Sequence, residues 1–203
     1  RALELTAAGG HNILLYGPPV TGKTMLASRL PSIMPSLNTE QAISVASIYS
    51  LCGLHYPYWD KPPFRSPHHS SSAVALVGGG SQPKPGEISL SHCGILFLDE
   101  FPEFSRQVLE VLREPLESGE IHISRANAQV CYPSQFTLVA ALNPCQCGYF
   151  GSRIKGHSCK CTPDQVRQYR RKISGPLLDR IDLQVPVNHI PANELQNIPD
   201  SES

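Results

Sequence analysis

The sequence lacks an excess of either charge, a long apolar run and an internal repeat. Its 17 basic and 17 acidic residues cancel, so no global field attracts the chain to nucleic acid, and such contacts would have to come from a local patch or from assembly. Without a long apolar run or a signal peptide, we expect a cytoplasmic protein with no membrane partner.

Length and cysteine content narrow the class further. A chain of 203 residues with 40% apolar content suits one α/β domain with small insertions. It begins with Arg1 rather than Met and ends in a polar tail at residues 199–203, so we expect it to be part of a longer protein. Four of its seven cysteines are clustered, which favours metal ligands or free thiols over disulfides in a cytosolic protein.

The most informative segment is ILLYGPPVTGKT, residues 13–24, in which a short apolar run leads into a phosphate-binding loop pattern. The loop consists of Gly17, Pro18, Pro19, Val20, Thr21, Gly22, Lys23 and Thr24. Such a loop points backbone N–H groups at phosphate oxygens, as does the start of the helix that follows. With a strand at 12–16 and a helix at 23–30, the pattern predicts ATP or ADP binding. Lys23 would reach the terminal phosphates and Thr24 would ligate Mg²⁺.

Val20 is the unusual residue of this loop. If the backbone there needs a positive φ, a β-branched side chain costs roughly 1–2 kcal/mol. We therefore expect either an ordinary backbone conformation at Val20 or weakened phosphate binding.

Polar residues follow two further apolar strands, at 95–98 and 136–142. Asp99 and Glu100 come directly after the first, at the strand end where α/β sheets bind ligands. Asp99 could hold the Mg²⁺ ion and Glu100 could polarise an attacking water. Asn143 follows the second strand and could orient that water or contact the γ-phosphate, although a turn Asn before proline is the simpler alternative.

Strands alternate with helical stretches, which predicts a mainly parallel sheet with helices on both faces. We expect a helix at 39–51, capped by Asn38 or Thr39, with Ile43, Ala46 and Ile48 facing inward. A helix at 105–117 should be bent or shortened near its end by Pro115. Further predicted elements are a long irregular insertion at 53–72, a hairpin of 120–124 and 129–132, a helix opening at 162–163, and a last strand at 181–187.

Four segments carry a resemblance to a known family: FRSPHHSSSAVALVGGG, PKPGEISLSHCGILFLDE, REPLESGEIHISRA and SGPLLDRIDL. With the motifs above, they resemble the AAA+ ATPases, specifically the magnesium-chelatase-like branch and its competence-related ComM/YifB family, over about residues 8–187. The resemblance implies a P-loop NTPase fold, a three-layer α/β sandwich around a mainly parallel sheet. It also implies a hexameric ring-forming ATPase and DNA helicase associated with branch migration in natural transformation.

The resemblance also implies roles for single residues and segments. Lys23 and Thr24 belong to its Walker A motif, Asp99 and Glu100 to Walker B, Asn143 to sensor 1 and Arg180 to the arginine finger. Residues 53–85 resemble the helix-2 insert and 119–132 the hairpin before sensor 1, both of which commonly face the ring pore and its DNA. Residues 1–190 would form the ATPase core, and 191–203 a linker toward a helical lid that this chain lacks.

A Cys-rich loop at 143–162 is a candidate zinc site. Cys145 and Cys147 are separated by eleven residues from Cys159 and Cys161, and two such pairs can form a tetrahedral thiolate site that pins a loop without a core. His157 is a substitute ligand, and four free thiols are the alternative.

Three further features allow more than one interpretation. Arg180 could pair internally with Asp179 or Asp182, or reach a nucleotide on a neighbouring subunit. The run RQYRRK at 167–172 is either a solvated helix face or a contact to DNA or an adjacent subunit. His68 and His69 are either polar loop residues or contacts to a phosphate backbone.

Two other functions remain open. The chain could be a chelatase-type motor subunit that remodels a partner protein, an interpretation that the cysteine cluster and the PHHSSS segment disfavour. Alternatively, it could be a nucleotide- and zinc-binding module without turnover, which the unusual Val20 keeps possible.

Overall fold

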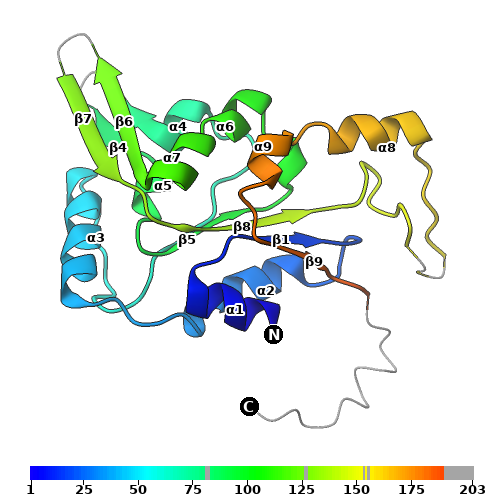
Figure 1. Cartoon of the computed structure of the whole chain (residues 1–203), viewed down its shortest axis with the longest axis horizontal. Helices are drawn as coiled ribbons and strands as arrows, with labels where there is room; N and C mark the ends of the chain where they lie inside the picture. The colour runs from blue at the N-terminus through cyan, green and yellow to red at the C-terminus, as the bar shows by residue number, and fades with distance from the viewer. Residues whose placement is uncertain (81–82, 126–127, 153, 155, 190–203) are drawn as a thin grey trace.

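A five-stranded parallel sheet runs through the molecule in the order β2-β5-β8-β1-β9 (Figure 1). The computed structural model describes residues 1–80, 83–125, 128–152, 154 and 156–189. The strands are β1 (Ile13–Tyr16), β2 (Phe64–Arg65), β5 (Ile95–Leu98), β8 (Thr137–Leu142) and β9 (Leu183–Pro186). The predicted fold class, an α/β sandwich around a mainly parallel sheet, is confirmed.

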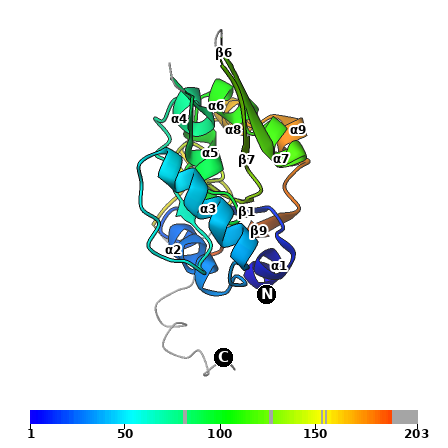
Figure 2. The ribbon, with the colours of Figure 1, turned by 90° about the vertical axis from the view of Figure 1, so that its left-hand side faces the viewer.

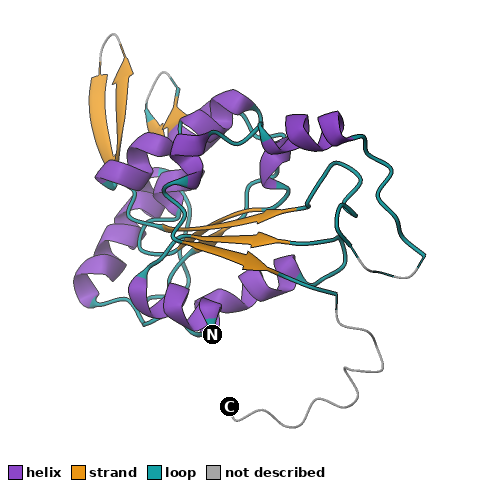
Figure 3. Ribbon diagram, turned by 45° about the vertical axis from the view of Figure 1, so that its right-hand side comes forward, coloured by secondary structure: helices purple, strands orange, loops and turns teal. Residues whose placement is uncertain are grey.

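Alternate residues of the central strands enter two separate cores. One core contains Leu14, Leu96 and Leu138, with side chains from α4 (Ala73–Val77), α5 (Glu87–Leu90), α6 (Arg106–Glu110) and α9 (Gly175–Leu178). The other contains Ile13, Phe97 and Val139, with side chains from α1 (Ala2–Gly9) and α2 (Lys23–Arg29). Because side chains alternate along a strand, the sheet becomes the middle layer of three, as Figure 3 shows.

The remaining elements are mostly short, apart from α3 (Thr39–Leu51). The others are η1 (Leu30–Ser32), β3 (Gly78–Gly79), β4 (Lys84–Pro85), η2 (Phe101–Glu103), α7 (Arg113–Ser118), β6 (Glu120–Arg125), β7 (Ala128–Pro133) and α8 (Pro163–Arg170). No helix within the described ranges is long and apolar enough to cross a membrane. The expected linker at 191–203 lies outside the described residues.

Helix α3 has the predicted bounds but a different inward face. Asn38 is the cap, and it forms a capping box with Gln41. The buried residues are Ala42, Val45, Ile48 and Tyr49. Ile43 is 52% exposed and Ala46 is half-buried, so the prediction that Ile43 faces inward was wrong. The helix packs the stripe containing Val45 and Ile48 against Leu90, and Ile43 lies on the other side.

The helix expected at 105–117 is split into α6 and α7. The break falls at residues 111–112, earlier than predicted. Proline cannot accommodate the carbonyl four residues before it in a continuous helix, and for Pro115 that residue is Val111. Pro115 therefore lies in the first turn of α7, where no N–H donor is needed.

The segment expected to be an irregular insertion contains an edge strand of the central sheet. β2 pairs in parallel with β5, with Phe64 opposite Ile95. A two-residue strand carries no alternation pattern to detect, which explains why the sequence analysis missed it. The predicted hairpin does form: β6 and β7 pair antiparallel and project from the body (Figures 1 and 2).

Candidate functional site

Three predicted motifs meet at one edge of the sheet. β1 and β8 are in register, with Tyr16 opposite Leu142, and β5 and β8 are in register, with Leu98 opposite Ala140. The segments that follow these strands are the loop at 17–22, the Asp99-Glu100 pair and Asn143. Because the strands are parallel, their carboxyl ends share an edge, and residues separated by more than a hundred positions become neighbours.

Glycines shape the loop after β1. A Cβ atom on Gly17 would collide with the carbonyl oxygen of Val187, so no side chain fits there. Gly22 has φ 84° at the N-cap of α2, a conformation that glycine adopts at little cost. Val20 has φ 62° and is 94% exposed. Of the two expectations for Val20, the structure therefore excludes an ordinary backbone conformation.

Lys23 is folded over this loop. Its Nζ donates to the carbonyl oxygens of Gly17 at 2.8 Å and Pro18 at 2.7 Å, and to Oδ1 of Asn143 at 3.2 Å. All three donors of the ammonium group are thus used. Burial lowers the pKa of Lys23, and the charge of Asp99 opposes this shift. The structure therefore brings a cation, an amide and the loop backbone to one point.

Thr24 and Asp99 form the oxygen-rich part of the edge. Thr24 Oγ1 donates to Asp99 Oδ2 at 2.7 Å, and the backbone N–H of Glu100 donates to Asp99 Oδ1 at 2.9 Å. A hydroxyl and a carboxylate are hard oxygen ligands of the kind that Mg²⁺ takes, with water and phosphate oxygens completing its shell. The donor set therefore fits this ion.

Glu100 stands in a left-handed backbone conformation, with φ 51° and ψ 43°. Such a conformation costs a non-glycine residue on the order of 1–3 kcal/mol and is concentrated at functional sites. The Glu100 side chain contacts His69, whose Nδ1 lies 3.0 Å from Oε2.

The contact between His69 and Glu100 was not predicted from the sequence. The link depends on β2, because the segment that follows this strand lies next to the end of β5. A signal for the contact would have been available only if β2 had been recognised.

Arg180 lies at the opposite end of the strands, near the amino ends of β1 and β9. It precedes β9, whose first residue Leu183 pairs with Ile13 at the start of β1. The four residues of β1 separate it from the phosphate loop by about 13 Å along the strand. The guanidinium forms an ion pair with Glu117 of α7 and donates from Nη1 to the carbonyl oxygen of Pro176 at 2.5 Å.

The expected acidic partners of Arg180 act differently. Asp182 accepts a hydrogen bond from the backbone N–H of Asn12 at 2.7 Å, so it fixes the strand end. The internal partner of Arg180 is Glu117 and neither Asp179 nor Asp182. Because Glu117 is 54% exposed and the Arg180 side chain 25% exposed, this pair borders solvent.

The four clustered cysteines converge. The Sγ atoms of Cys145 and Cys147 are 3.3 Å apart, and that of Cys159 lies 3.7 and 3.6 Å from them. Cys161 completes the group, all within 4.8 Å of one another. Zn–S bonds of about 2.3 Å in a tetrahedron place sulfurs about 3.8 Å apart, so the geometry fits zinc.

Two details refine the zinc hypothesis. Hydrogen bonds from the backbone N–H groups of Tyr149 and Lys160 lower the pKa of Cys147 to about 6, which favours its thiolate. The pKa of Cys159 and of Cys161 is raised, because burial and the neighbouring thiols outweigh the backbone hydrogen bond that each accepts, so Cys147 is the thiol of the three that ionises most readily. His157 stacks on Tyr149, with ring centroids 4.8 Å apart, and is absent from the metal-ligand group that the described residues form. The structure thus favours the four thiols over His157 as ligands.

The Cys-rich loop packs against the phosphate loop. A Cβ atom on Gly148 would lie 2.7 Å from Cδ of Pro19. Arg170 of α8 lies over the ring of Phe150 at 5.1 Å, and its Nε is 3.4 Å from the carbonyl oxygen of Pro144. The basic run is therefore not a uniformly solvated face, since Arg170 turns toward this loop.

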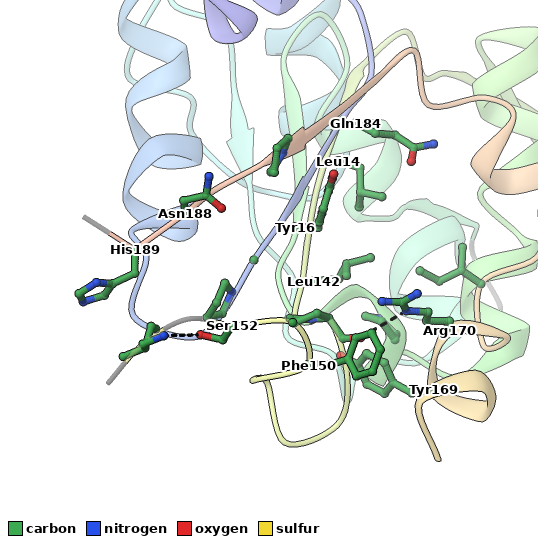
Figure 4. A pocket seen from close by; sticks show the side chains of 18 of the residues that line it. Leu14, Tyr16, Leu142, Phe150, Ser152, Tyr169, Arg170, Gln184, Asn188 and His189 are labelled. Atoms are coloured by element: carbon green, nitrogen blue, oxygen red, sulfur yellow. Dashed lines mark hydrogen bonds between the residues drawn. The ribbon is translucent and has the colours of Figure 1, made fainter. Parts of the chain in front are cut away.

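A cavity of about 1300 Å³ lies between these elements. Figure 4 shows Tyr16 and Leu142 from the sheet, and Phe150 and Arg170 on another side of it. Gly17 and Pro18 also line the cavity, so it adjoins the phosphate loop. The cavity was not predicted from the sequence, because segments that are far apart in the chain line it.

Known proteins are similar to this chain over most of its length. The family model described as "Magnesium chelatase, subunit ChlI" matches residues 1–195. The chain is 55% identical to YifB of Salmonella typhimurium, over 92% of this chain and 37% of that protein, and 53% identical to competence protein ComM of Haemophilus influenzae, over 98% and 39%. It is 25% identical to the magnesium-chelatase 38 kDa subunit of Rhodobacter capsulatus, over 70% and 46%.

A solved structure shares the fold. This structure is NtrX from Brucella abortus in complex with ADP. The match covers 92% of this chain and 34% of the NtrX chain, with a TM-score of 0.57 and 15% sequence identity. The chain spans about two fifths of the length of the YifB and ComM relatives.

The positive φ of Val20 generates a prediction about stability. Replacing Val20 by Gly should raise the free energy of unfolding by up to about 1 kcal/mol, because relief of the left-handed strain outweighs the entropy of an added glycine. Val20→Ala, which keeps Cβ, should gain less. Denaturant titration of both variants measures this. Equal or lower stability of Val20→Gly would show that the loop carries no such strain.

Proposed function

The chain belongs to the magnesium chelatase, subunit ChlI family and has the AAA+ ATPase fold, and from that premise we propose that it binds Mg-ATP and hydrolyses it. One observation carries the proposal: Lys23, Asn143, Thr24 and Asp99 form a continuous set of contacts at the edge where β1, β5 and β8 end. We take residues 1–190 as the ATPase core.

In this proposal the phosphates bind over the loop at 17–24. Lys23 exchanges its contacts with the carbonyl oxygens of Gly17 and Pro18 for phosphate oxygens, which are stronger acceptors. Thr24 and Asp99, whose side-chain oxygens are 2.7 Å apart, would hold Mg²⁺, which would neutralise charge on the phosphates. Asn143, which contacts Lys23, is left next to the terminal phosphate.

Glu100 is the proposed general base. Its carboxylate follows the Mg²⁺ ligand Asp99 directly, and the left-handed backbone turns it away from the strand direction. His69 contacts the same carboxylate and is proposed to hold it until the site is loaded. The water that attacks the γ-phosphate would lose its proton to Glu100.

Arg180 is proposed to act in trans. Because it lies at the opposite edge of its own sheet, it cannot serve its own phosphate loop, whereas a neighbouring copy could receive it across an interface. This is the reason to propose a homo-oligomeric ring, and the proposed number of six subunits comes from the family resemblance alone.

The wider role is proposed from the relatives. Identity of 53% with a competence protein, against 25% with a magnesium-chelatase subunit, favours a ComM-like DNA branch-migration helicase over a chelatase-type motor. The segments at 53–85 and 119–132 would face DNA in the pore, and the protein would work in the cytoplasm. A nucleotide and zinc module without turnover is the remaining candidate, since Val20 and Glu100 both carry unusual backbone conformations.

The four cysteines are proposed to hold one structural zinc ion. They supply four thiolates with no position left for water, so the ion would pin the loop that packs on Pro19 and would take no part in hydrolysis.

Substitutions of Glu100 and of Lys23 should separate ATP hydrolysis from nucleotide binding. Glu100→Gln should bind ATP normally and lose hydrolysis by about 10²–10⁴-fold, because an amide cannot accept the proton of water. Lys23→Ala should lose nucleotide binding. Titration calorimetry and phosphate release measure the two properties. Glu114→Gln, an exposed change outside the site, is the control, and wild-type turnover by Glu100→Gln would remove Glu100 from its role.

Removing one cysteine ligand should release the structural zinc. Cys159→Ser should contain about one zinc per chain less than the wild type and should unfold at a lower temperature. Cys52 is the control: it lies far from the cluster in sequence, and its thiol contacts the carbonyl oxygen of Pro85. Cys52→Ser should therefore keep its zinc. Elemental analysis distinguishes them. Equal zinc in Cys159→Ser and wild type would contradict the assignment.

Mixing two inactive variants tests whether Arg180 acts across an interface. Arg180→Ala should bind ATP but hydrolyse it about 10³-fold more slowly. Adding Lys23→Ala chains should restore activity, because their Arg180 then faces an intact phosphate loop.

Glu117→Gln is the matched control, since it breaks the internal ion pair and leaves Arg180 in place. If Arg180 serves only that pair, Glu117→Gln should reproduce the defect, both variants should lose thermal stability, and mixing should restore nothing.

A further inference from the structure

A second group of metal-ligating side chains lies on the β6–β7 hairpin. The two strands pair antiparallel, with His122 opposite Cys131 and Ile121 opposite Tyr132. Because side chains alternate between the two faces of a strand, one face of this ribbon is apolar and the other polar. The polar face carries Glu120, His122 and Cys131, all exposed.

The ligand atoms of this face are already close together. Cys131 Sγ lies 3.4 Å and His122 Nε2 3.6 Å from Oε2 of Glu120, and the three ligand atoms lie within 4.8 Å of one another. For a tetrahedral ion with metal–sulfur bonds of about 2.3 Å and metal–nitrogen or metal–oxygen bonds of about 2.0–2.1 Å, ligand atoms are about 3.3–3.6 Å apart. The observed contacts match this spacing without a change of backbone.

The apolar face holds the ribbon in place. Ile121, Ile123 and Tyr132 are buried in the core, and Tyr132 Oη donates to the carbonyl oxygen of Pro83 at 2.8 Å. The Ser118 hydroxyl donates to the carbonyl oxygen of Glu120 at 3.0 Å. The strand register is therefore fixed, and with it the faces on which the three ligands stand.

We propose that Glu120, His122 and Cys131 form a binding site for a borderline divalent transition-metal ion of the zinc class, with a fourth position open to water. The ligand set excludes Mg²⁺ and Ca²⁺ as preferred occupants, because these ions take oxygen ligands and discriminate against thiolate and imidazole. Binding would displace the thiol proton of Cys131 to solvent and replace its hydrogen bond to Glu120 with two metal bonds.

The site would differ in kind from the four-cysteine cluster. Three protein ligands with an open position are the pattern of exchangeable or catalytic ions, whereas four thiolates form a closed site. The ion would also join the two strands, since His122 and Cys131 are direct cross-strand partners. The proposal is independent of nucleotide hydrolysis, because none of its ligands belongs to the phosphate-binding edge.

Titration of the intact purified protein with Co²⁺ tests the site, since Co²⁺ bound to thiolate absorbs in the near ultraviolet and visible. The wild type should bind one equivalent more Co²⁺ than Cys131→Ser, with a thiolate band that the variant lacks. His122→Gln and Glu120→Gln should lower the affinity for that equivalent of Co²⁺ by at least about tenfold, because removing even a group that only supports a metal ligand costs about this much. Excess Mg²⁺ should not compete.

Gln129→Ala, on the same exposed face of β7, is the matched control and should bind as the wild type does. All four substitutions are at exposed positions, and circular dichroism would establish that each variant is folded. Equal Co²⁺ stoichiometry and equal spectra in wild type and Cys131→Ser would overturn the proposal, whatever the content of the four-cysteine cluster. The proposal would also fail if Gln129→Ala lost as much binding as His122→Gln.

Discussion

The parallel register of β1, β5 and β8 is the constraint on which the candidate site depends. The segment after each strand contributes little by itself: a loop after β1, a pair of carboxylates after β5 and one amide after β8. Because the three strands end at the same edge, Lys23 meets Asn143 and Thr24 meets Asp99. The two apolar cores on either side of the sheet hold that register, so a change deep in either core would act on the site by shifting strand ends. Binding chemistry and core packing are therefore not separable in this fold.

Sequence alone predicted the features whose signals are local. The glycine-bounded loop before Lys23 and the Asn38 cap depend on residues a few positions apart, and their geometry was foreseeable. The missed features depend on tertiary contacts. The strand at 64–65 is too short to show a period, and without it the contact between His69 and Glu100 has no visible cause. The partner of Arg180 is Glu117, sixty-three residues earlier in the chain, rather than the acids beside it, because chain proximity does not decide which carboxylate a long side chain meets.

The Cys-rich loop has a mechanical relation to the nucleotide edge. Its first cysteine comes two residues after Asn143, and the loop returns to pack Gly148 against Pro19 of the phosphate loop. The loop has little apolar content, and the proposed zinc ion would add free energy that holds it in this position. On this argument the proposed zinc would support both the amide that contacts Lys23 and the outer side of the phosphate loop, while staying outside the chemistry.

Backbone strain and the position of Arg180 bear on the same question, which is what a single chain would need from a neighbour in order to hydrolyse nucleotide. Val20 and Glu100 carry unfavourable φ values at the edge of the sheet, so the loop and the turn that contain them, and not local preference, set their conformations. Glu100 is also engaged by His69, and the segment that carries Arg180 lies about one strand length away. A single chain therefore presents the phosphate loop, the proposed Mg²⁺ ligands and the proposed base without the Arg180 cation opposite them. Assembly would supply that cation from a neighbour, and this would couple hydrolysis to the formation of the interface.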